Sequence, residues 1–508
     1  MRGSIEHFRE WLASGLAVGR PLALRTTLIL AVTVFLFSFL VKSLHALDLS
    51  PVMHTSAQLA GGMTSEYDRR AVSITAGHGV LIPDDDDSSD TCLLAHAPGY
   101  SIFLSLIYRV FGRRYLTVQQ FQNLLNSISP VLPLLIVGRT LSWRVGTGAA
   151  LLAAGSHHLS YYSNFVLPDS LSSLPILIGA LLAATPTRNR RATWRFAAAG
   201  IALGFSAWLR ANSLLLPVWA GLVRAITGRP RRHAFLNAAI LVGFWFLTVT
   251  PTTVRNYLIF REFVPIQIGF GITLWEGIGD TDHGRFGGPR SDADVIAREA
   301  AEYDDPNYGY SWSTPDGIQR DRDRDRVKRC LAIISAHPFW FTGSAFVRAE
   351  TGIQYNTHAP LVFRKDDRSL AETGVAAREQ LDEYVRDALA RGEWALAAGE
   401  LFELSRPVIR VFQRIAKEPM QIFVVLGGLA VLAVSRRAAL VMIVVPGYYL
   451  LIQSILHTEF RYTLPMQYFL FSFAAATWCL IGAAVFSGAG LLKAKLVTND
   501  KGRVGSTE

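Results

Sequence analysis

The residues best suited to chemistry are five consecutive polar ones, Glu66 to Arg70, in the stretch GGMTSEYDRRAVSI (residues 61–74). A deprotonated Glu66 or Asp68 can act as a general base on a hydroxyl group within hydrogen-bond reach. The arginines beside them can hold a phosphate or a second carboxylate. The same residues also suit the polar face of a surface helix. The choice depends on where the cluster lies in the molecule.

Other polar residues that could take part in a reaction occur singly: His96, Asp169, Arg210, Arg255, His457 and Arg461. Each has a simpler role. Asp169 follows Pro168 and precedes an apolar helix, so the residues alone favour a helix N-cap. His96 is typical of a loop histidine, and Arg461 with Tyr462 is typical of an anchor at a membrane boundary. Whether these residues have a functional role therefore also depends on where they lie in the molecule.

The composition predicts a polytopic membrane protein. The 508 residues are 18% charged, with a mean hydropathy of +0.27, whereas soluble domains carry about 25% charge. Apolar residues are concentrated in runs of about 17–22 residues, long enough to cross a bilayer as helix. The first, Thr26–Val41 extending to Leu47, is too long for a signal-peptide core, so we expect an uncleaved span. Further spans are expected near 119–138, 145–165, 169–185, 195–209, 211–227, 234–256, 420–435, 438–456 and 463–486.

Basic residues in the short loops predict the orientation. They are Arg2, Arg9, Arg20 and Arg25; Arg139 and Arg144; Arg188, Arg190, Arg191 and Arg195; Arg229, Arg231 and Arg232; Arg436 and Arg437; and Lys493, Lys495 and Lys501. With ten spans and both termini in the cytoplasm, every group lies on the cytoplasmic side. The net charge of +10 reflects this bias, so no nucleic-acid partner is expected. We expect a multi-pass protein of a cell membrane, the inner or plasma membrane of a bacterium.

This orientation divides the chain into four parts. Residues 1–257 form an N-terminal transmembrane module with a first outer loop at 48–112, and 258–418 form a large outer loop. Residues 419–487 form the C-terminal spans, and 488–508 form a cytoplasmic tail. Cys92 and Cys330 both lie outside, where a disulfide between them and two reduced thiols are equally compatible with the sequence.

The outer segments contain further expected elements. A helical pattern covers 57–77, and Ser101–Phe111 is an apolar helix too short to span the bilayer. In the large loop, REFVPIQIGFGITLWEGIGD (261–280) is expected to be irregular, and a helix is expected around 315–336. Its RDRDRDR run (320–326) alternates charge and is expected to be a solvated face. Interfacial helices are expected at HPFWFTGSAFVR and at ELSRPVIRVFQRIAKEP.

The candidate residues gather on the outer side of the membrane, whereas the spans are nearly free of ionisable groups, with Arg210 the main exception. A transporter is expected to carry charges or broken helices near the bilayer midplane. The pattern favours a site at the outer membrane boundary, acting on a lipid-linked substrate.

Several motifs in order resemble the GT-C glycosyltransferase superfamily. HAPGYSIFLSLIYRVFG (96–112) is similar to its Pro-Pro-Gly-Tyr-Pro segment, in the branch with the protein O-mannosyltransferases and the lipid A aminoarabinose transferases. The other matching segments are EYDRRAVSITAGHG, NFVLPDSL, GFSAWLRANSLLLP, VRNYLIFREFVPIQIGFGITLWEG and HTEFRYTLP. Together they cover most of residues 20–485.

The resemblance implies an all-α GT-C bundle of about ten or more transmembrane helices, with juxtamembrane helices in the first outer loop. It implies an inverting transfer of a sugar, by a hexosyl- or pentosyltransferase, from a polyprenyl-phosphate donor to an acceptor hydroxyl on the outer face. The partners would be this donor, membrane lipids and a glycan, lipid or protein acceptor. Relatives use a carboxylate of the first outer loop as base and an Arg, a Lys or a metal ion to stabilise the leaving phosphate.

The residue-by-residue match has one departure. Relatives carry an acid four residues before the position of Tyr67, where this chain has Met63, which cannot accept a proton. Either Glu66 or Asp68 replaces it, with Glu66 preferred because it lies one helical turn away. The alternatives are that a different acid takes the role or that the protein is not a conventional catalyst.

The other family positions match as follows. Asp169 matches the second-loop acid, His96 matches a donor-phosphate contact, and Arg461 with His457 and Tyr462 fits the C-terminal phosphate contact. Tyr67, Tyr100 and Arg210 complete the expected substrate-binding set. A divalent metal is possible if the fold gathers Glu66, Asp68, His96 and Asp169.

Two other functions remain open at this point. One is a transporter or flippase of lipid-linked glycans. The other is a GT-C-like protein that binds a polyprenyl lipid without catalysis, which Met63 would explain.

Overall fold

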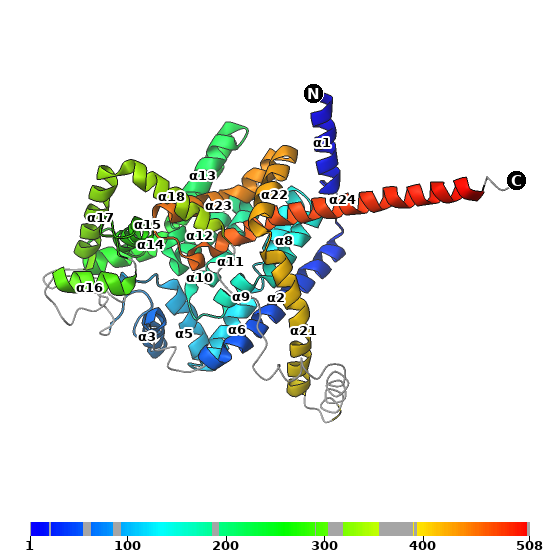
Figure 1. Cartoon of the computed structure of the whole chain (residues 1–508). Helices are drawn as coiled ribbons and strands as arrows, with labels where there is room; N and C mark the ends of the chain where they lie inside the picture. The colour runs from blue at the N-terminus through cyan, green and yellow to red at the C-terminus, as the bar shows by residue number, and fades with distance from the viewer. Residues whose placement is uncertain are drawn as a thin grey trace.

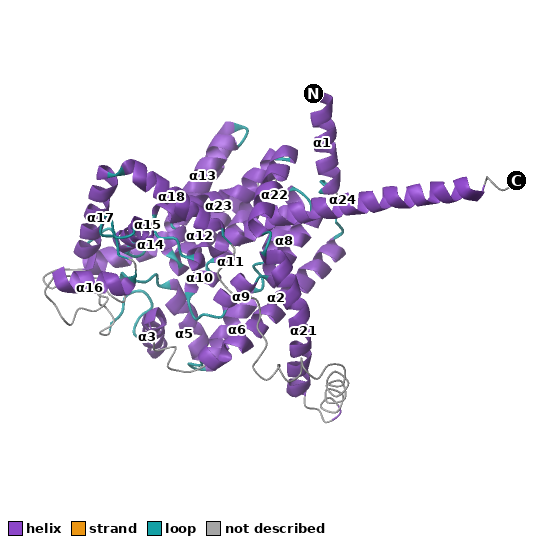
Figure 2. Ribbon diagram, in the orientation of Figure 1, coloured by secondary structure: helices purple, strands orange, loops and turns teal. Residues whose placement is uncertain are grey.

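The computed structural model describes residues 2–19, 22–53, 62–84, 93–184, 193–289, 291–302, 319–354, 390 and 394–504. Within these ranges the regular secondary structure is helical, and no strand occurs (Figure 2). The all-α class predicted from the apolar runs is confirmed.

The N-terminal half contains the helices α1 (Arg2–Gly15), α2 (Leu24–Met53), α3 (Gly62–Ala76), α5 (Gly99–Phe111), α6 (Tyr115–Asn126), α7 (Val131–Thr140), α8 (Trp143–Gly155), α9 (His157–Ser163), α10 (Pro168–Leu171), α11 (Ser173–Ala184), α12 (Thr193–Leu209), the 3-10 turn η4 (Ala211–Ser213), α13 (Leu216–Thr227) and α14 (Arg231–Phe260). The C-terminal half contains α15 (Phe270–Asp282), α16 (Asp292–Glu302), α17 (Gln319–Ala336), α18 (Pro338–Ile353), α21 (Trp394–Lys417), α22 (Met420–Val434), α23 (Arg436–Ile455), the 3-10 turn η5 (Phe460–Thr463) and α24 (Leu464–Val504).

The main apolar core surrounds the first half of α24, where Tyr468–Phe471 and Phe473–Ala476 are buried against α7, α8, α11, α22 and α23. Gly427 allows the close approach of α22, because a Cβ added there would lie 1.8 Å from the carbonyl oxygen of Phe473. The remainder of α24 extends away from the bundle (Figure 1). Apolar side chains on both the inner and outer surfaces, such as Leu28 and Phe246 outside, fit helices that face lipid.

Five helical segments are long and apolar enough to cross a membrane: Leu24–Leu47, Tyr115–Thr140, Arg231–Phe260, Arg436–Ile455 and Phe460–Ser487. The number rises to eight if each of three bent pairs counts as one span. One of these, His157–Ser163 with Pro168–Ala184, bends by 119°, and its break falls between the spans expected at 145–165 and 169–185. The span expected at 145–165 is itself divided, because α8 ends at Gly155 and α9 begins at His157. Other expected spans are shorter helices, such as Ala211–Thr227. The broken and short helices leave backbone and polar groups at the helix ends, where the candidate residues lie.

Two predictions for the large outer loop are wrong. The segment expected to be irregular contains the helix α15. The RDRDRDR run is not a solvated face throughout, because Arg322, Asp323 and Arg326 are buried. Asp323 accepts hydrogen bonds from the backbone N–H groups of Gly271 (2.9 Å) and Ile272 (3.3 Å), so it caps the start of α15 from another helix.

The arginines of the same run hold α16 against α17. Arg326 donates two hydrogen bonds to Glu299, from Nε (2.8 Å) and from a terminal nitrogen (2.6 Å), and Arg322 Nε lies 3.6 Å from the same carboxylate. The charges alternate in sequence, but the helix turns Arg322, Asp323 and Arg326 inward, where they are buried with partners from other helices. The helical pattern at 57–61 and residue Cys92 lie outside the described residues, and Cys330 is a free, buried thiol.

We predict that Glu299→Gln weakens the packing of α15 to α17 by about 3–5 kcal/mol, because it leaves buried arginines without their carboxylate. Glu302→Gln is the matched control, since Glu302 pairs with Arg329 on the exposed side of the same helices and should cost about 1 kcal/mol or less. Hydrogen exchange of the α15–α17 amides, followed by mass spectrometry, measures both. Equal protection in the two variants would contradict the assignment of Glu299 as the buried anchor.

Candidate functional site

Helix α3 is positioned by one apolar face. Tyr67, Ala71 and Ile74 follow a helical spacing and are all buried, and α3 packs on α5. The Tyr67 ring lies 4.6 Å from the His96 ring and 5.3 Å from the Tyr100 ring, between centroids. Ser101 donates a hydrogen bond to the carbonyl oxygen of Tyr67 (3.1 Å). The segment HAPGY (96–100) therefore holds α3 in place beside the other residues of the predicted site.

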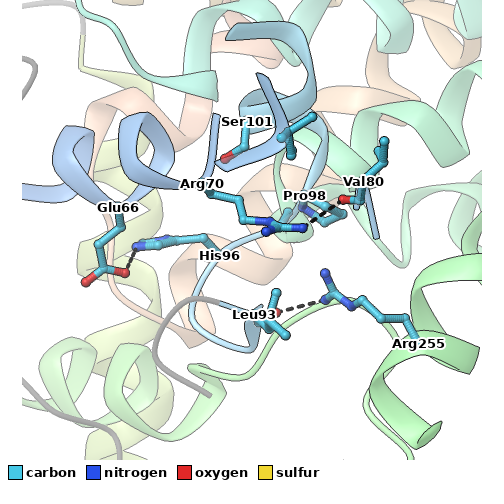
Figure 3. A pocket seen from close by; sticks show the side chains of 10 residues that line it. Glu66, Arg70, Val80, Leu93, His96, Pro98, Ser101 and Arg255 are labelled. Atoms are coloured by element: carbon cyan, nitrogen blue, oxygen red, sulfur yellow. Dashed lines mark hydrogen bonds and ion pairs between the residues drawn. The ribbon is translucent and has the colours of Figure 1, made fainter. Parts of the chain in front are cut away.

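Glu66 faces His96. The Oε2 atom of Glu66 lies 3.0 Å from Nε2 of His96, and both side chains are partly exposed, at 29% and 18%. Solvent access is what a base needs if it is to meet an acceptor from the water side. Figure 3 shows this pair at one end of a small cavity. Met63 lies in the same helix, but its side chain is outside the described part of the structure.

Asp68 has a structural position. Its carboxylate accepts hydrogen bonds from Arg113 at both oxygens (2.9 and 2.5 Å) and from the Tyr108 hydroxyl (2.7 Å), and it is only 4% exposed. Both oxygens of this carboxylate are already bound, so neither is available to an acceptor hydroxyl. Of the two alternatives for the acid missing at Met63, the geometry favours Glu66.

Asp169 is not an N-cap. The N-cap of α10 is Leu167, and Asp169 lies in the first turn with its side chain 3% exposed. Its Oδ1 atom is 3.3 Å from Nε of Arg210, and neither carboxylate oxygen accepts a hydrogen bond from a described residue. Buried carboxylates normally have hydrogen-bond partners. Asp169 therefore has acceptor capacity that the protein itself does not use.

The guanidinium groups of Arg210 and Arg461 both lie against the ring of Tyr462. The guanidinium carbon of Arg210 lies 4.5 Å from the ring centroid, and that of Arg461 lies 5.1 Å from it. Arg461 donates a hydrogen bond to Glu459 (2.5 Å), and Asn212 donates one to the Tyr462 carbonyl (3.2 Å). We call Asp169, Arg210, Arg461 and Tyr462 the arginine cluster. It joins the ends of α10, α12 and η5, which are far apart in sequence.

Tyr67 connects the arginine cluster with the Glu66–His96 pair. Its phenol interacts electrostatically with the charges of Arg210, Asp169 and Arg461, and its ring lies against His96. Burial raises the pKa of Tyr67 above its ordinary value and outweighs the opposing arginines, so the hydroxyl stays protonated and can donate a hydrogen bond.

His457 and Tyr100 have different surroundings from those expected. His457 Nδ1 lies 2.8 Å from Asp280 on α15, and its ring is 6.3 Å from the Tyr462 ring. Tyr100 is fully buried and donates its hydroxyl hydrogen bond to Gln122 (2.7 Å). His457 thus borders the arginine cluster, whereas Tyr100 supports Tyr67 from behind and has no surface for a substrate.

The described residues contain no group of three or more His, Cys, Asp or Glu side chains able to hold a metal ion. The residues considered as ligands lie in separate pairs. Asp68 binds Arg113, Glu66 pairs with His96, and Asp169 pairs with Arg210. This donor set does not fit a divalent metal, so no step is assigned to one.

One buried ionisable residue, Lys42, was not among the candidates predicted from the sequence. Lys42 in α2 is fully buried within the first span and donates a hydrogen bond to Ser38 (2.6 Å). Asn164, which precedes α10, donates to the Lys42 carbonyl oxygen (3.2 Å). The sequence does contain a signal for Lys42: it is a lysine within an apolar run, and charged residues inside membrane spans are rare.

No family model and no curated protein matches the chain. Among solved structures, the chain is similar to the oligosaccharyltransferase AglB from Archaeoglobus fulgidus, in complex with an inhibitory peptide and a dolichol-phosphate (TM-score 0.46, 10% identity, 94% of this chain and 52% of that one). It is also similar to ArnT from Cupriavidus metallidurans, bound to undecaprenyl phosphate (TM-score 0.35, 14% identity, 91% and 78%).

The chain spans about half the length of the AglB chain. Identities of 10% and 14% and TM-scores below 0.5 do not assign a family. The function is therefore argued from the site itself.

We predict that Asp68→Asn lowers the free energy of unfolding by about 2–3 kcal/mol, because it breaks charged hydrogen bonds to Arg113 and Tyr108. Asp84→Asn is the control, since Asp84 is 73% exposed beside His78 and should change stability little. Thermal unfolding in detergent measures both. Wild-type stability of Asp68→Asn would contradict the structural role.

A second prediction concerns pH. Burial alone would lower the pKa of His457, but the hydrogen bond to Asp280 and the charges of Asp280, Glu276 and Glu459 raise it above its ordinary value. The pair therefore stabilises the fold fully below the unfolded-state pKa of about 6.5, and this contribution is lost as the pH rises through the raised pKa. The difference in unfolding temperature between wild type and Asp280→Asn should narrow from about pH 6 to about pH 9. A constant difference across this range would exclude a charged pair.

Proposed function

We propose that this protein transfers a sugar from a polyprenyl-phosphate donor to an acceptor hydroxyl, at the extracytoplasmic boundary of the membrane. The observation that carries the proposal is the arginine cluster. Two guanidinium groups lie against one tyrosine ring at the ends of apolar helices. Beside them is a buried carboxylate that accepts no hydrogen bond from the part of the chain that the structure describes. Such a place suits a phosphate whose lipid tail lies in the bilayer and whose sugar faces Asp169.

Arg210 and Arg461 would bind the donor phosphate. As the bond from the anomeric carbon to the phosphate oxygen breaks, the leaving polyprenyl phosphate gains negative charge. Guanidinium groups stabilise it through charge-assisted hydrogen bonds, most strongly where water is excluded. Asp169 orients Arg210, and its unused oxygen accepts a hydrogen bond from a sugar hydroxyl.

Glu66 would act as the base. The acceptor oxygen attacks the anomeric carbon from the side opposite the phosphate, its proton moves to Glu66, and the configuration inverts. His96 holds the Glu66 carboxylate at 3.0 Å and so positions it. Tyr67, between the base and the arginine cluster, donates a hydrogen bond to the donor.

The arrangement of basic loops supports the outer face for this site. In Figure 1, α1 and the turn between α13 and α14, which carry basic residues, lie on one side of the bundle, and α3 lies on the other. Basic loops are enriched in the cytoplasm.

We predict that Glu66→Gln lowers the rate of sugar transfer by about 10²–10⁴-fold, the usual effect of losing a general base. Arg461→Gln should lower it by about 10²–10³-fold, because the leaving phosphate loses a stabilising positive charge. Asp169→Asn should also lower it, because Arg210 loses the carboxylate that orients it. Arg324→Gln, in the exposed pair with Glu262, is the control and should retain the wild-type rate. The assay follows release of labelled sugar from a polyprenyl-phosphate donor in membranes that contain native acceptors.

Two outcomes would contradict the proposal. Wild-type rates in Glu66→Gln, Asp169→Asn and Arg461→Gln would remove the site. Donor binding without turnover in the wild type would identify a lipid-binding protein that has lost its acid at Met63.

A further inference from the structure

Four amide side chains form a polar stripe on one face of α6. Gln119, Gln122, Asn123 and Asn126 recur at helical spacing, and each is at most 1% exposed. They lie in the segment Tyr115–Thr140, which is apolar enough to cross a membrane. Buried amides in such a segment cost free energy unless their hydrogen bonds are satisfied. We call these four residues the amide stripe, and its hydrogen-bond partners indicate its role.

The amide stripe faces the bend between α9 and α10. The last carbonyl groups of a helix have no partner within it, and irregular backbone inside a membrane is tolerated only where the protein satisfies its polar groups. Gln119 donates a hydrogen bond to the carbonyl oxygen of Asn164 (3.1 Å). Gln122 donates to the carbonyl oxygens of Ser163 (3.0 Å) and Phe165 (2.6 Å). The amide stripe therefore holds the bend that leads into α10.

The orientation of the Gln122 amide group follows from its partners. Carbonyl oxygens only accept hydrogen bonds, so the amide nitrogen must face the bend. The amide oxygen then faces the hydroxyl of Tyr100, which donates a hydrogen bond to it (2.7 Å). Gln122 is fully buried, and both ends of its amide group are used. One side chain on α6 thus joins the bend to α5.

The Tyr100 side of this link leads to the proposed base. Tyr100 lies edge-on to Tyr67, with 5.3 Å between the ring centroids, and Tyr67 follows Glu66 in α3. Thr64, in the first turn of α3, donates a hydrogen bond to the carbonyl oxygen of Val166 in the bend (3.4 Å). A displacement of Tyr100 and the bend would therefore displace the helix that carries Glu66.

The other side of the link leads to Asp169. Ser170 follows it in α10, and the Oγ atom of Ser170 lies 3.4 Å from Nε2 of Gln122. The same Oγ atom accepts a shorter hydrogen bond from Asn126 (2.9 Å), about one turn further along α6. Because α10 has only four residues, these contacts fix its rotation. They thereby fix the direction of the Asp169 carboxylate toward Arg210.

We propose that Gln122 is a positioning residue for sugar transfer, which sets the position of Asp169 on the donor side relative to Glu66 on the acceptor side. The inference rests on the proposed function, because it uses the roles given there to these two carboxylates. The acceptor oxygen, the anomeric carbon and the leaving phosphate must be aligned, and an error of about 1 Å lowers the rate by about 10²-fold. Gln122 contacts no reacting atom and acts through Tyr100 and Ser170.

The alternative is that Gln122 only satisfies the backbone of the bend. Gln119 is the matched control, because it lies about one turn earlier on α6, is equally buried and donates to the middle of the same bend. Methionine is similar in length to glutamine but cannot donate a hydrogen bond. Gln122→Met and Gln119→Met should therefore both leave buried carbonyl groups unpaired and lower the unfolding temperature to a similar extent.

The first experiment measures sugar transfer from the labelled polyprenyl-phosphate donor by the full-length protein, in membranes that contain native acceptors. Gln122→Met should lower kcat by about 10–10²-fold, with a smaller change in the donor KM because Arg461 is unaltered. Gln119→Met should retain the wild-type kcat. Gln122→Glu should recover part of the rate, because a buried carboxyl group stays protonated, accepts from Tyr100 and donates to one carbonyl oxygen. Equal losses of kcat in the two methionine variants would overturn the proposal.

The second experiment tests whether Gln122 acts through its two neighbours. Tyr100→Phe and Ser170→Ala each remove one of its contacts. Adding Gln122→Met to the Tyr100→Phe/Ser170→Ala double variant should lower kcat little further, whereas independent effects would multiply and overturn the coupling. If Gln122→Met does not fold, a wild-type kcat in the double variant would still overturn the proposal.

The third experiment is hydrogen exchange in nanodiscs, which needs no substrate. The amides of α5 and α10 should lose protection together in Gln122→Met and keep it in Gln119→Met. This result without sugar transfer by the wild type would contradict the proposed function but retain the link between the two helices. A normal kcat in Gln122→Met with an active wild type would contradict the positioning role and leave the proposed function. Unchanged protection of α5 and α10 would overturn the link itself.

Discussion

The structure depends on one constraint: charged side chains removed from water must find partners, and these partners come from distant parts of the chain. Asp68 meets Arg113, Asp169 meets Arg210, and Glu299 meets Arg326. Each pair joins parts of the chain that are far apart in the sequence: α3 and the turn after α5, α10 and the residue after α12, and α16 and α17. Losing one partner of such a pair costs more than the pair itself contributes, so these contacts specify the arrangement of the outer elements.

The same constraint distinguishes structural charges from candidate functional ones. Asp68 has both oxygens bound, and Glu299 is held by two hydrogen bonds from one guanidinium group. Asp169 is as buried as either but accepts no hydrogen bond from the described residues. The acceptor capacity that the described residues leave unused at Asp169 is what distinguishes it as a candidate for binding a ligand.

The sequence predicted the class of fold because long apolar runs leave few alternatives to membrane helices. It also predicted which residues belong near one another, through a resemblance that aligned Glu66, His96, Asp169 and Arg461 in order. It was wrong where local pattern and tertiary burial disagree. The RDRDRDR run has the spacing of a solvated helix face, yet α15 and α16 bury Arg322, Asp323 and Arg326. Asp169 has the sequence setting of an N-cap, yet its carboxylate turns to Arg210.

By itself the sequence determined the helical, membrane-spanning character, the bias of basic loops and the short list of polar residues, because hydrophobicity and charge are properties of each residue. The difference between Glu66 and Asp68 is visible only in the tertiary structure. The two side chains are two positions apart on α3 and so point in different directions, one toward His96 and the cavity, the other into the clamp of Arg113 and Tyr108.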